Sequence, residues 1–338
     1  MTELGLNIEN LSIAFDRGRK EAISGLDLKV LPSQALGLVG ESGSGKSLAS
    51  RAALGLLPRK ARVTGRITLD GQSVLELSPA QLRRIRGSGI AMIFQDPMSS
   101  LNPVVRVGEA IAQVIRSHES VAQGVALERA VALMARVGIR DPETRMRSFP
   151  HEFSGGMRQR IMIAMALAAR PRMLLADEPT TALDVIVQDG ILKLLDQLRR
   201  DEGMGLLLVS HDLAVVGSVC DRIAVMYAGQ IVEEGPAMDV LMRSRMPYTV
   251  GLHASTQRSK TLKRLPSIPG APPPLGERPA SCRFAARCPL VAPQCLAGPV
   301  PLVSVGSDHM ARCVRTAEVA NLDRATFTVR EREAAHNG

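Results

Sequence analysis

The sequence predicts an α/β fold in which a parallel sheet is wrapped by helices. Two observations predict it. Apolar segments of strand length alternate with helix-length segments along residues 35–210. An octapeptide at 40–47 has the pattern G-x-x-x-x-G-K-[ST] and joins one of these strands to the next helix. Ligands of such sheets bind at the carboxyl ends of the strands. The length of 338 residues also leaves room for an extension.

The elements around the octapeptide follow from local patterns. Short β-rich segments at 6–13 and 26–30 predict two strands, and the apolar run 35–39 predicts a buried one. A helix is expected at 48–57. The alternating run 63–71 predicts a further strand that ends in a turn.

Strands and helices then alternate as far as residue 210. The predicted elements are a strand at 90–94, helices across 107–137 with a polar break at 117–123, a helix after Gly155, a strand at 172–176, a helix at 185–201 and a strand at 205–210. After Met242 six prolines indicate an extended linker: Pro266, Pro269, Pro272, Pro273, Pro274 and Pro279. We therefore expect a first domain at 1–242 and a second region at 243–338.

Charge is unevenly distributed along the chain. The net charge of +9 resides in residues 243–315, and the remainder is balanced. Such a basic region can face anionic lipid, nucleic acid, an acidic partner or solvent alone. Nucleic acid is disfavoured because Tyr248 and Phe284 are the only aromatic residues of this region available for stacking.

Membrane-spanning and targeting segments are not expected. The longest apolar stretch, 161–169, ends at Arg170 and Pro171, well short of a membrane helix. The start Met1-Thr2-Glu3 lacks the order of a signal peptide. The expectation is a cytosolic protein that can sit on a membrane surface.

The octapeptide predicts a site for the phosphates of a nucleotide. Its glycines let successive backbone N–H groups surround an anion at a helix N-terminus. Lys46 is expected to reach the β- and γ-phosphates, and the Ser47 hydroxyl to bind Mg²⁺. The expected nucleotide-binding residues are Gly40, Glu41, Ser42, Gly43, Ser44, Gly45, Lys46 and Ser47.

Two carboxylates follow the predicted strand at 172–176. Asp177 is expected to hold Mg²⁺, and Glu178 to orient or deprotonate the attacking water. An acidic pair after a strand is often only a solvated turn. After a phosphate-binding loop it indicates a nucleotide hydrolase.

The segment 153–160, FSGGMRQR, resembles the L-S-G-G-Q signature of ATP-binding cassette proteins. The resemblance implies a P-loop ABC-type nucleotide-binding domain with a parallel sheet core, an antiparallel β subdomain, a helical subdomain and, here, a C-terminal extension. It also implies a head-to-tail cassette dimer, in which Ser154, Gly155 and Gly156 bind the γ-phosphate held by the other subunit. Phe153 and Met157 depart from the commonest form of the signature.

Other positions match the family in order. Gln95 corresponds to its Q-loop glutamine, which touches Mg²⁺ or the attacking water. Asp184, in the segment 181–184, corresponds to the D-loop at the dimer interface. His211 corresponds to the H-loop histidine that contacts the γ-phosphate, and Phe15 to the aromatic residue that stacks on adenine, although each can also be an ordinary structural residue.

Four cysteines cluster after the proline-rich linker, spaced C-x₅-C-x₆-C-x₁₇-C, and Cys220 lies apart. Four thiols so close together in a cytosolic protein favour a metal over disulfides. The spacing lacks a short zinc knuckle and leaves iron–sulfur and zinc open. The predicted ligands are Cys282, Cys288, Cys295 and Cys313.

The region that holds these cysteines is similar to the C-terminal extension of the ATPase subunits of oligopeptide and dipeptide permeases. The similarity rests on the segments 246–249, 267–270, 282–289 and 309–313. It implies a four-iron four-sulfur cluster on the cysteines. Ser281 stands where the family commonly has glycine, which puts the local turn in question but not the ligands.

The resemblance implies an ATPase subunit of a peptide importer at the cytoplasmic face of the inner membrane. Its partners would be a second, similar ATPase subunit in a heterodimer (or a homodimer), two transmembrane permease subunits and an extracytoplasmic substrate-binding protein. The segment 102–105 is expected near the permease contact. Other cargoes (nickel chelates, sugars or opines) and a non-transport iron–sulfur ATPase or redox sensor are the alternatives.

Overall fold

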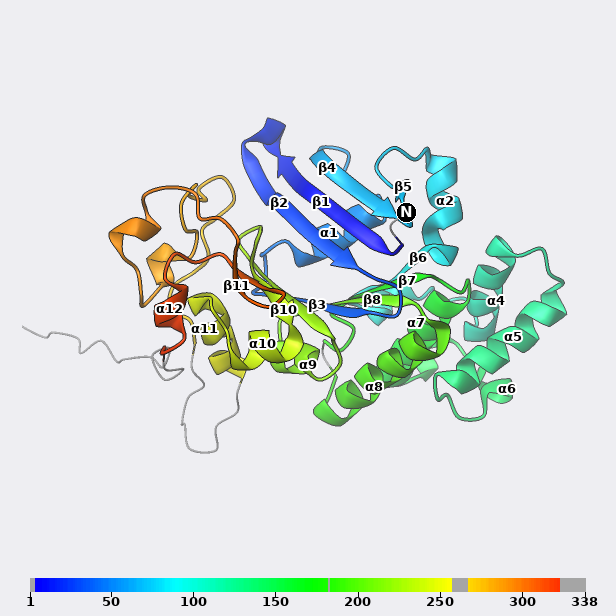
Figure 1. Ribbon diagram of the computed structural model, residues 1–338. Coiled ribbons are helices and arrows are strands. Elements are labelled where there is room, and N and C mark those ends of the chain that lie inside the picture. Colours follow the sequence, from blue (N-terminus) through cyan, green and yellow to red (C-terminus); the bar gives the residue numbers. More distant parts are fainter. Residues whose placement is uncertain (1–3, 182, 257–266, 323–338) are drawn as a thin grey trace, which may run out of the picture.

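The computed structural model places one eight-stranded sheet at the centre of the molecule (Figure 1). Five of its strands form the parallel core in the order β9-β3-β8-β7-β6. They are β3 (Ala35–Val39), β6 (Ile90–Ile93), β7 (Met173–Asp177), β8 (Gly205–Ser210) and β9 (Arg222–Tyr227). Parallel strands end at the same edge, so the residues after β3, β6, β7 and β8 meet there. The predicted parallel sheet is confirmed.

The structure describes residues 4–181, 183–256 and 267–322. Some sequence predictions concern positions that lie outside these ranges. These positions are Met1-Thr2-Glu3, Ala182 in the D-loop segment, Pro266 at the start of the linker prolines and the tail to Gly338.

The remaining strands of the main sheet are antiparallel. They are β10 (Gln230–Pro236), β12 (His309–Ala311) and β11 (Val303–Gly306), in that order outward from β9. The C-terminal region therefore adds two strands to the sheet of the cassette instead of forming a free-standing unit after the linker. The domain boundary at 242/243 stays a prediction.

A second sheet covers one face of the first. Its antiparallel order is β2-β1-β4-β5. The strands are β1 (Leu6–Phe15), β2 (Lys20–Val30), β4 (Arg62–Leu69) and β5 (Gln72–Ser73). One apolar cluster joins these strands to the main sheet and to α1 (Lys46–Ala53), which follows the octapeptide. This sheet is the predicted antiparallel β subdomain.

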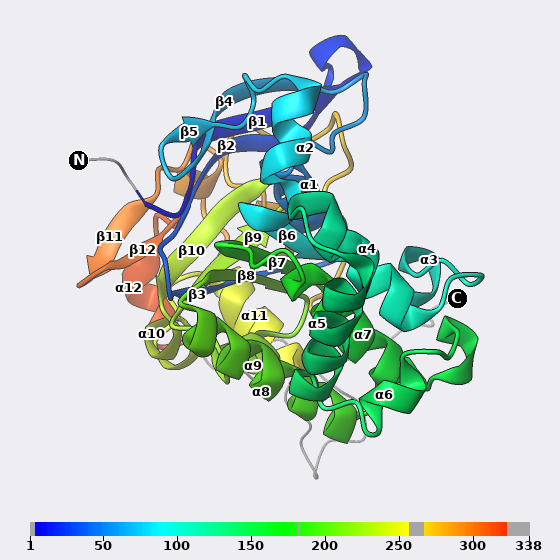
Figure 2. The ribbon, with the colours of Figure 1, turned by 90° about the vertical axis from the view of Figure 1, so that its right-hand side faces the viewer.

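A group of helices extends from the β6 and β7 side of the main sheet (Figure 2). It consists of α3 (Pro97–Ser100), α4 (Val107–His118), α5 (Gln123–Arg136), α6 (Pro142–Arg145) and α7 (Gly155–Leu167). The break between α4 and α5 lies within the polar segment that the sequence singled out. The predicted helical subdomain is present.

Further helices complete the fold. They are α2 (Pro79–Ser88), α8 (Val185–Glu202), α9 (Leu213–Gly217), α10 (Ala237–Met242), α11 (Pro247–Thr256) and α12 (Thr316–Val319). Short 3₁₀ turns occur at Asp16–Gly18, Pro150–Glu152, Ala285–Arg287 and Pro293–Cys295. Within the described ranges, every helix is too short or too polar to cross a bilayer.

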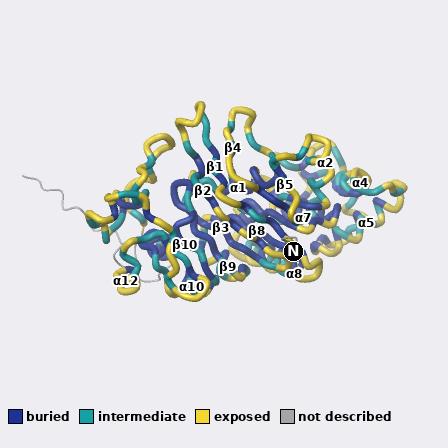
Figure 3. The backbone as a smooth tube through the Cα atoms, turned by 45° about the horizontal axis from the view of Figure 1, so that its top comes forward, coloured by how far each residue is buried: buried dark blue, intermediate teal, exposed yellow. Residues whose placement is uncertain are grey.

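Two predicted boundaries were wrong. The helix expected at 48–57 starts at Lys46 and ends at Ala53, because Gly55 adopts a left-handed turn with φ of 63°. The strand expected at 26–30 begins at Lys20, where polar residues conceal its pairing with β1. The core strands themselves are buried, as Figure 3 shows for β3 and β8.

Candidate functional site

The octapeptide forms the loop between β3 and α1. Gly40 and Gly45 have φ of 155° and 113°, backbone conformations that residues with a Cβ rarely adopt. A Cβ on Gly40 would lie 2.1 Å from the carbonyl oxygen of Met226, so this turn also depends on close backbone approach. The loop leads into the N-terminus of α1, where the first N–H groups have no partners within the helix and favour an anion.

Lys46 is held inside this loop. Its Nζ donates to the carbonyl oxygens of Gly40 at 2.7 Å and Glu41 at 2.9 Å, and lies 3.4 Å from the Ser44 hydroxyl. The side chain is buried, and desolvation lowers its pKa, although Glu178 and other nearby carboxylates oppose that shift. A cation buried in an anion-binding loop is placed to bind phosphate.

Ser47 and Asp177 form a ready pair of oxygen ligands. The Ser47 hydroxyl donates to Asp177 Oδ1 at 2.8 Å. Asp177 is the last residue of β7 and only 3% exposed. Burial raises its pKa, and the hydrogen bond from Ser47 opposes that rise. A hydroxyl beside a buried carboxylate fits Mg²⁺, which needs few protein ligands.

Glu178 is the centre of a polar cluster. Its Oε2 accepts hydrogen bonds from Gln95 Nε2 at 3.1 Å and the Thr181 hydroxyl at 2.9 Å. His211 Nδ1 lies 3.4 Å from the same oxygen. The residue has φ of 49°, which turns the chain sharply at the end of β7. Residues after three neighbouring strands thus converge on one carboxylate, as parallel topology predicts.

Two cavities share Glu178 in their walls, one of about 380 Å³ and one of about 270 Å³. The smaller one also contains Thr181 and His211. The predicted site residues that line the larger one are Phe15, Ser42, Gly43, Gly45, Lys46, Ser47, Gln95 and Glu178. The structure therefore brings together residues that the sequence predicted for adenine stacking, phosphate binding, metal binding and catalysis.

The signature segment lies elsewhere on the chain. Ser154 caps α7, and its Oγ accepts from the backbone N–H of Met157 at 3.4 Å. Gly156 packs against Val187 of α8, and a Cβ there would lie 2.6 Å from Val187 Cγ1. Asp184 caps α8 by accepting from the backbone N–H of Val187 at 2.9 Å. Among the described residues that line the two cavities, none belongs to 154–156 or is Asp184.

The four clustered cysteines line one small apolar cavity in the C-terminal region. Their thiols are free, and the backbone N–H of Cys282 donates to the Cys295 carbonyl at 3.2 Å. Burial raises the pKa of Cys288 to about 12 and that of Cys313 to about 11. In the described ranges, no three His, Cys, Asp or Glu side chains are arranged closely enough to hold an ion. The four cysteines nevertheless line one cavity, and thiolate sulfurs are the donors that an iron–sulfur cluster or zinc uses.

Comparison with known proteins identifies the family. The ABC transporter profile matches residues 23–181, and the profile of the oligopeptide/dipeptide transporter C-terminal region matches 232–295. A putative peptide import ATP-binding protein of Brucella abortus is 44% identical over 331 residues, covering 93% of this chain and 98% of that protein. The chain belongs to the ABC transporter family.

Other relatives support the assignment of this chain to the ABC transporter family. The oligopeptide transport ATP-binding protein OppD of Escherichia coli is 42% identical over 316 residues, covering 93% of this chain and 94% of that protein. OppD of Mycobacterium bovis is 46% identical over 325 residues, covering 95% of this chain. The cassette spans about half of the mycobacterial protein, 53% of its length.

Solved ABC cassettes share the fold. The ATP-binding cassette MJ0796, described as a dimer in a post-hydrolysis state with ADP and Pi, superposes with a TM-score of 0.61 at 25% identity. The match covers 69% of this chain and 98% of that cassette. It supports the ABC-type fold of the core.

The cassette also has nucleotide-cavity residues that sequence reasoning missed. Thr181 begins the predicted D-loop segment and was not assigned to the cluster around Glu178. Leu275 and Arg278 come from the C-terminal region and line the larger cavity. Arg278 Nη1 donates to the carbonyl oxygens of Glu21 at 3.1 Å and Ala22 at 2.8 Å. Only Thr181 had a local signal, its place four residues after Asp177.

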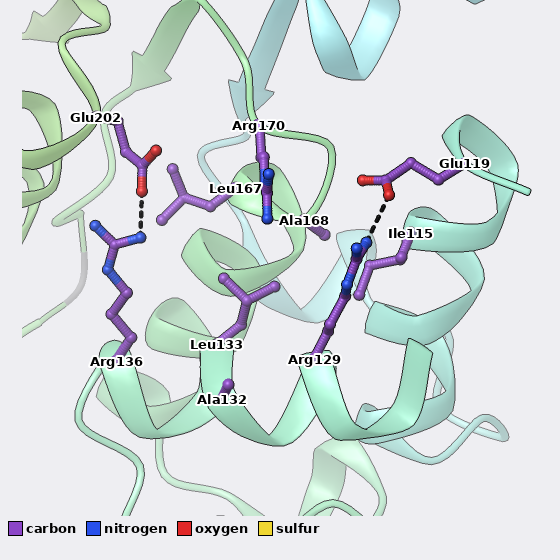
Figure 4. A pocket seen from close by; sticks show the side chains of 10 residues that line it. All are labelled: Ile115, Glu119, Arg129, Ala132, Leu133, Arg136, Leu167, Ala168, Arg170 and Glu202. Atoms are coloured by element: carbon purple, nitrogen blue, oxygen red, sulfur yellow. Dashed lines mark hydrogen bonds and ion pairs between the residues drawn. The ribbon is translucent and has the colours of Figure 1, made fainter. Parts of the chain in front are cut away.

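A separate cavity of about 360 Å³ lies in the helical part of the cassette (Figure 4). Its two carboxylates are already paired, Glu119 with Arg129 at 2.6 Å and Glu202 with Arg136. None of its lining residues belongs to the nucleotide motifs.

Proposed function

We propose that this chain is the ATP-hydrolysing subunit of an ABC importer that takes up peptides. The observation that carries the proposal is the cluster on Glu178, in which one carboxylate oxygen contacts Gln95, Thr181 and His211. The cluster lies beside the Ser47–Asp177 pair and the phosphate-binding loop. Membership of the peptide-transporter branch supports the transport role.

We assign each role from chemistry. The backbone N–H groups of the loop 40–47, other than that of Glu41, bind the phosphates, and Lys46 neutralises their charge. Ser47, Asp177 and Gln95 would hold Mg²⁺, which would supply positive charge to offset the charge that develops during phosphoryl transfer. Phe15 provides an apolar face for adenine.

Glu178 and His211 act at the terminal phosphate. Glu178 orients the attacking water and accepts its proton, because it is the carboxylate nearest the metal-binding pair that is not committed to the metal. His211, whose Nδ1 lies 3.4 Å from Glu178 Oε2, contacts the γ-phosphate. In this arrangement Gln95 and Thr181 hold the carboxylate in place.

We assign the signature to the nucleotide of a second cassette. Ser154, Gly155 and Gly156 form the N-terminus of the 13-residue helix α7, which presents N–H groups suited to a phosphate. These residues do not line the cavities of their own chain. Asp184 accompanies them at the dimer interface. A solved neighbour is described as dimeric, which supports this arrangement.

The remaining partners follow from the importer role. The second cassette is a similar subunit in a heterodimer, with a homodimer as the alternative. Two transmembrane permease subunits and an extracytoplasmic substrate-binding protein complete the system, and the cassette is peripheral at the cytoplasmic face of the inner membrane. The turn at 102–105 meets a permease, and the 78% exposure of the apolar Val104 side chain supports this contact.

For the C-terminal region we propose a unit at 243–338 that holds a four-iron four-sulfur cluster on Cys282, Cys288, Cys295 and Cys313. The shared cavity of these cysteines supports it, and zinc is the alternative. Iron and acid-labile sulfide analysis of anaerobically purified chain tests the assignment. Four irons and four sulfides per chain support it, whereas stoichiometric zinc without sulfide overturns it.

The test of the importer role is co-purification from native membranes. A tagged Glu178→Gln chain should trap the ATP-bound dimer, and mass spectrometry then identifies every captured protein. We expect a second cassette ATPase and two multi-span permeases, none of which appears from an untagged strain. Recovery of soluble partners or nucleic acid alone would overturn the proposal.

A further inference from the structure

The C-terminal region contacts Glu41, the second residue of the phosphate-binding loop. Arg287 forms a two-pronged ion pair with Glu41, Nη1 to Oε2 at 2.7 Å and Nη2 to Oε1 at 2.9 Å. The two residues are separated by 246 positions in the chain. Such paired hydrogen bonds fix direction as well as distance.

Arg287 is itself held rigidly. Its side chain is only 5% exposed, and it donates from Nε to the Pro269 carbonyl at 2.9 Å and from Nη2 to the Ile268 carbonyl at 3.2 Å. Its guanidinium lies 5.7 Å from the ring centre of Tyr227 and 5.8 Å from that of Phe284. The Arg287 side chain is therefore held in one orientation, unlike the arginine of a mobile ion pair on the surface.

A tyrosine holds the backbone of the same residue. The N–H of Glu41 donates to the Tyr248 hydroxyl at 2.8 Å. Tyr248 is fully buried and packs against Tyr227 and Phe284, with ring centres 4.5 Å and 5.4 Å away. Together with the bond from Lys46 to the Glu41 carbonyl, every polar group of Glu41 has a partner.

The negative charge of Glu41 makes its ion pair with Arg287 important for phosphate binding. A carboxylate in a loop that binds phosphates repels them unless a cation neutralises it. Arg287 supplies that cation through its ion pair with the Glu41 carboxylate. Because the loop must keep its other N–H groups aimed at the phosphates, the direction of Glu41 also matters.

We propose that Arg287 and Tyr248 are positioning residues for the phosphate-binding loop, so that the C-terminal region sets the affinity of this cassette for nucleoside triphosphate. The inference rests on the proposed ATP-binding function. It assigns to the C-terminal region a part in nucleotide binding that is separate from any group held by its cysteines.

The test is a double-mutant cycle on the full chain. Glu41→Gln, Arg287→Gln and the double variant are compared by equilibrium binding of a fluorescent ATP analogue with Mg²⁺. Arg287→Gln should weaken binding by about tenfold or more, because it leaves an unpaired carboxylate in the loop. Glu41→Gln should weaken binding less than Arg287→Gln does, because it leaves no unpaired carboxylate in the loop, and the double variant should recover most of the loss.

Controls separate positioning from general damage. Arg283→Gln removes another mostly buried arginine of this region, one that donates to the Ala228 carbonyl, and should leave nucleotide affinity unchanged. Tyr248→Phe keeps the ring and should weaken binding by a few-fold, since the Glu41 N–H loses its acceptor. If Arg287→Gln does not fold, Arg287→Lys replaces it: lysine keeps the charge but not the two-pronged geometry, so a loss of affinity in that variant reports the direction of Glu41 alone, and wild-type affinity overturns the positioning role.

The outcomes are distinct. Affinity in the double variant as poor as in Arg287→Gln, or wild-type affinity in Arg287→Gln, overturns the positioning role. Wild-type protein that binds no ATP analogue overturns the proposed function itself. Recovery in the double variant, with unchanged affinity in Arg283→Gln, supports the inference.

Discussion

Glu178 has the backbone and the partners expected of a residue under functional constraint. Its φ of 49° is unusual for a non-glycine residue, and its N–H donates to the Val209 carbonyl at 3.0 Å, which fixes the turn. Gln95 and Thr181 then fix the carboxylate. The backbone turn and the side-chain hydrogen bonds together fix the orientation of the Glu178 carboxylate.

Replacing Glu178 with glutamine should separate binding from hydrolysis. The amide has the same shape but cannot accept the proton of water, so the hydrolysis rate should fall by about 10²-fold or more while ATP affinity stays close to wild type. Steady-state phosphate release and nucleotide titration measure the two effects. Glu119→Gln, the same change in the cavity of Figure 4, is the matched control. Near-wild-type hydrolysis in Glu178→Gln would remove its assigned role.

At the scale of elements, the sequence predicted the core strands better than the contacts made by the C-terminal region. The buried strands β3, β7 and β8 have continuous apolar runs, and each ends next to a residue of the site. Parallel pairing then brings those ends together without any further information. The contacts of Arg278 and Arg287 could not be predicted in this way, since no local pattern indicates which carbonyl or carboxylate a distant arginine will meet.

The junction of β10 and β12 should respond to pH. Glu233 on β10 is fully buried, and burial raises its pKa above the ordinary value of 4.5, although the hydrogen bond from His309 on β12 at 2.9 Å opposes the rise. The folded protein therefore keeps this proton to higher pH than the unfolded chain does. As the pH rises above 4.5, this group lowers the free energy of unfolding.

Glu233→Gln should abolish that dependence. Relative to the variant, the wild type should lose stability between pH 5 and pH 8 by about 1.4 kcal/mol for each unit by which the pKa is raised. Denaturant titrations of both proteins at the two pH values measure it. Glu234→Gln changes the neighbouring residue, which pairs with Arg222. It shows how much of the pH dependence of the free energy of unfolding comes from other carboxylates of β10. If the free energy of unfolding of the wild type instead increases relative to that of Glu233→Gln as the pH rises, the assigned direction of the pKa shift is wrong.

In the whole molecule, the main sheet and the phosphate-binding loop are connected to two further regions, the helical part and the C-terminal region. The helical part carries the signature helix and the exposed turn after α3, and the C-terminal region reaches the phosphate-binding loop through Arg287. A linker rich in proline predicted an extension, but not that β11 and β12 would complete the main sheet. Strands of three or four residues have too little pattern to indicate a partner so far along the chain.

Coupling to a permease should depend on the turn at 102–105. Val104→Asp puts a charge where an apolar side chain is 78% exposed, so it should lower uptake by about tenfold or more while basal ATP hydrolysis is unchanged. Val125→Asp makes the same change on α5, where the side chain is 42% exposed, and should spare both activities. Equal uptake by wild type and Val104→Asp would place the permease contact elsewhere.

The central claim is that ATP hydrolysis by this chain drives peptide import, and the direct measurement is uptake by the purified complex. Complex captured through the tagged wild-type chain is reconstituted in vesicles that enclose ATP and Mg²⁺, with binding protein and labelled peptides outside. We expect labelled peptide to accumulate inside, and Glu178→Gln complex to accumulate little. Complex that hydrolyses ATP and accumulates no labelled peptide would contradict the claim.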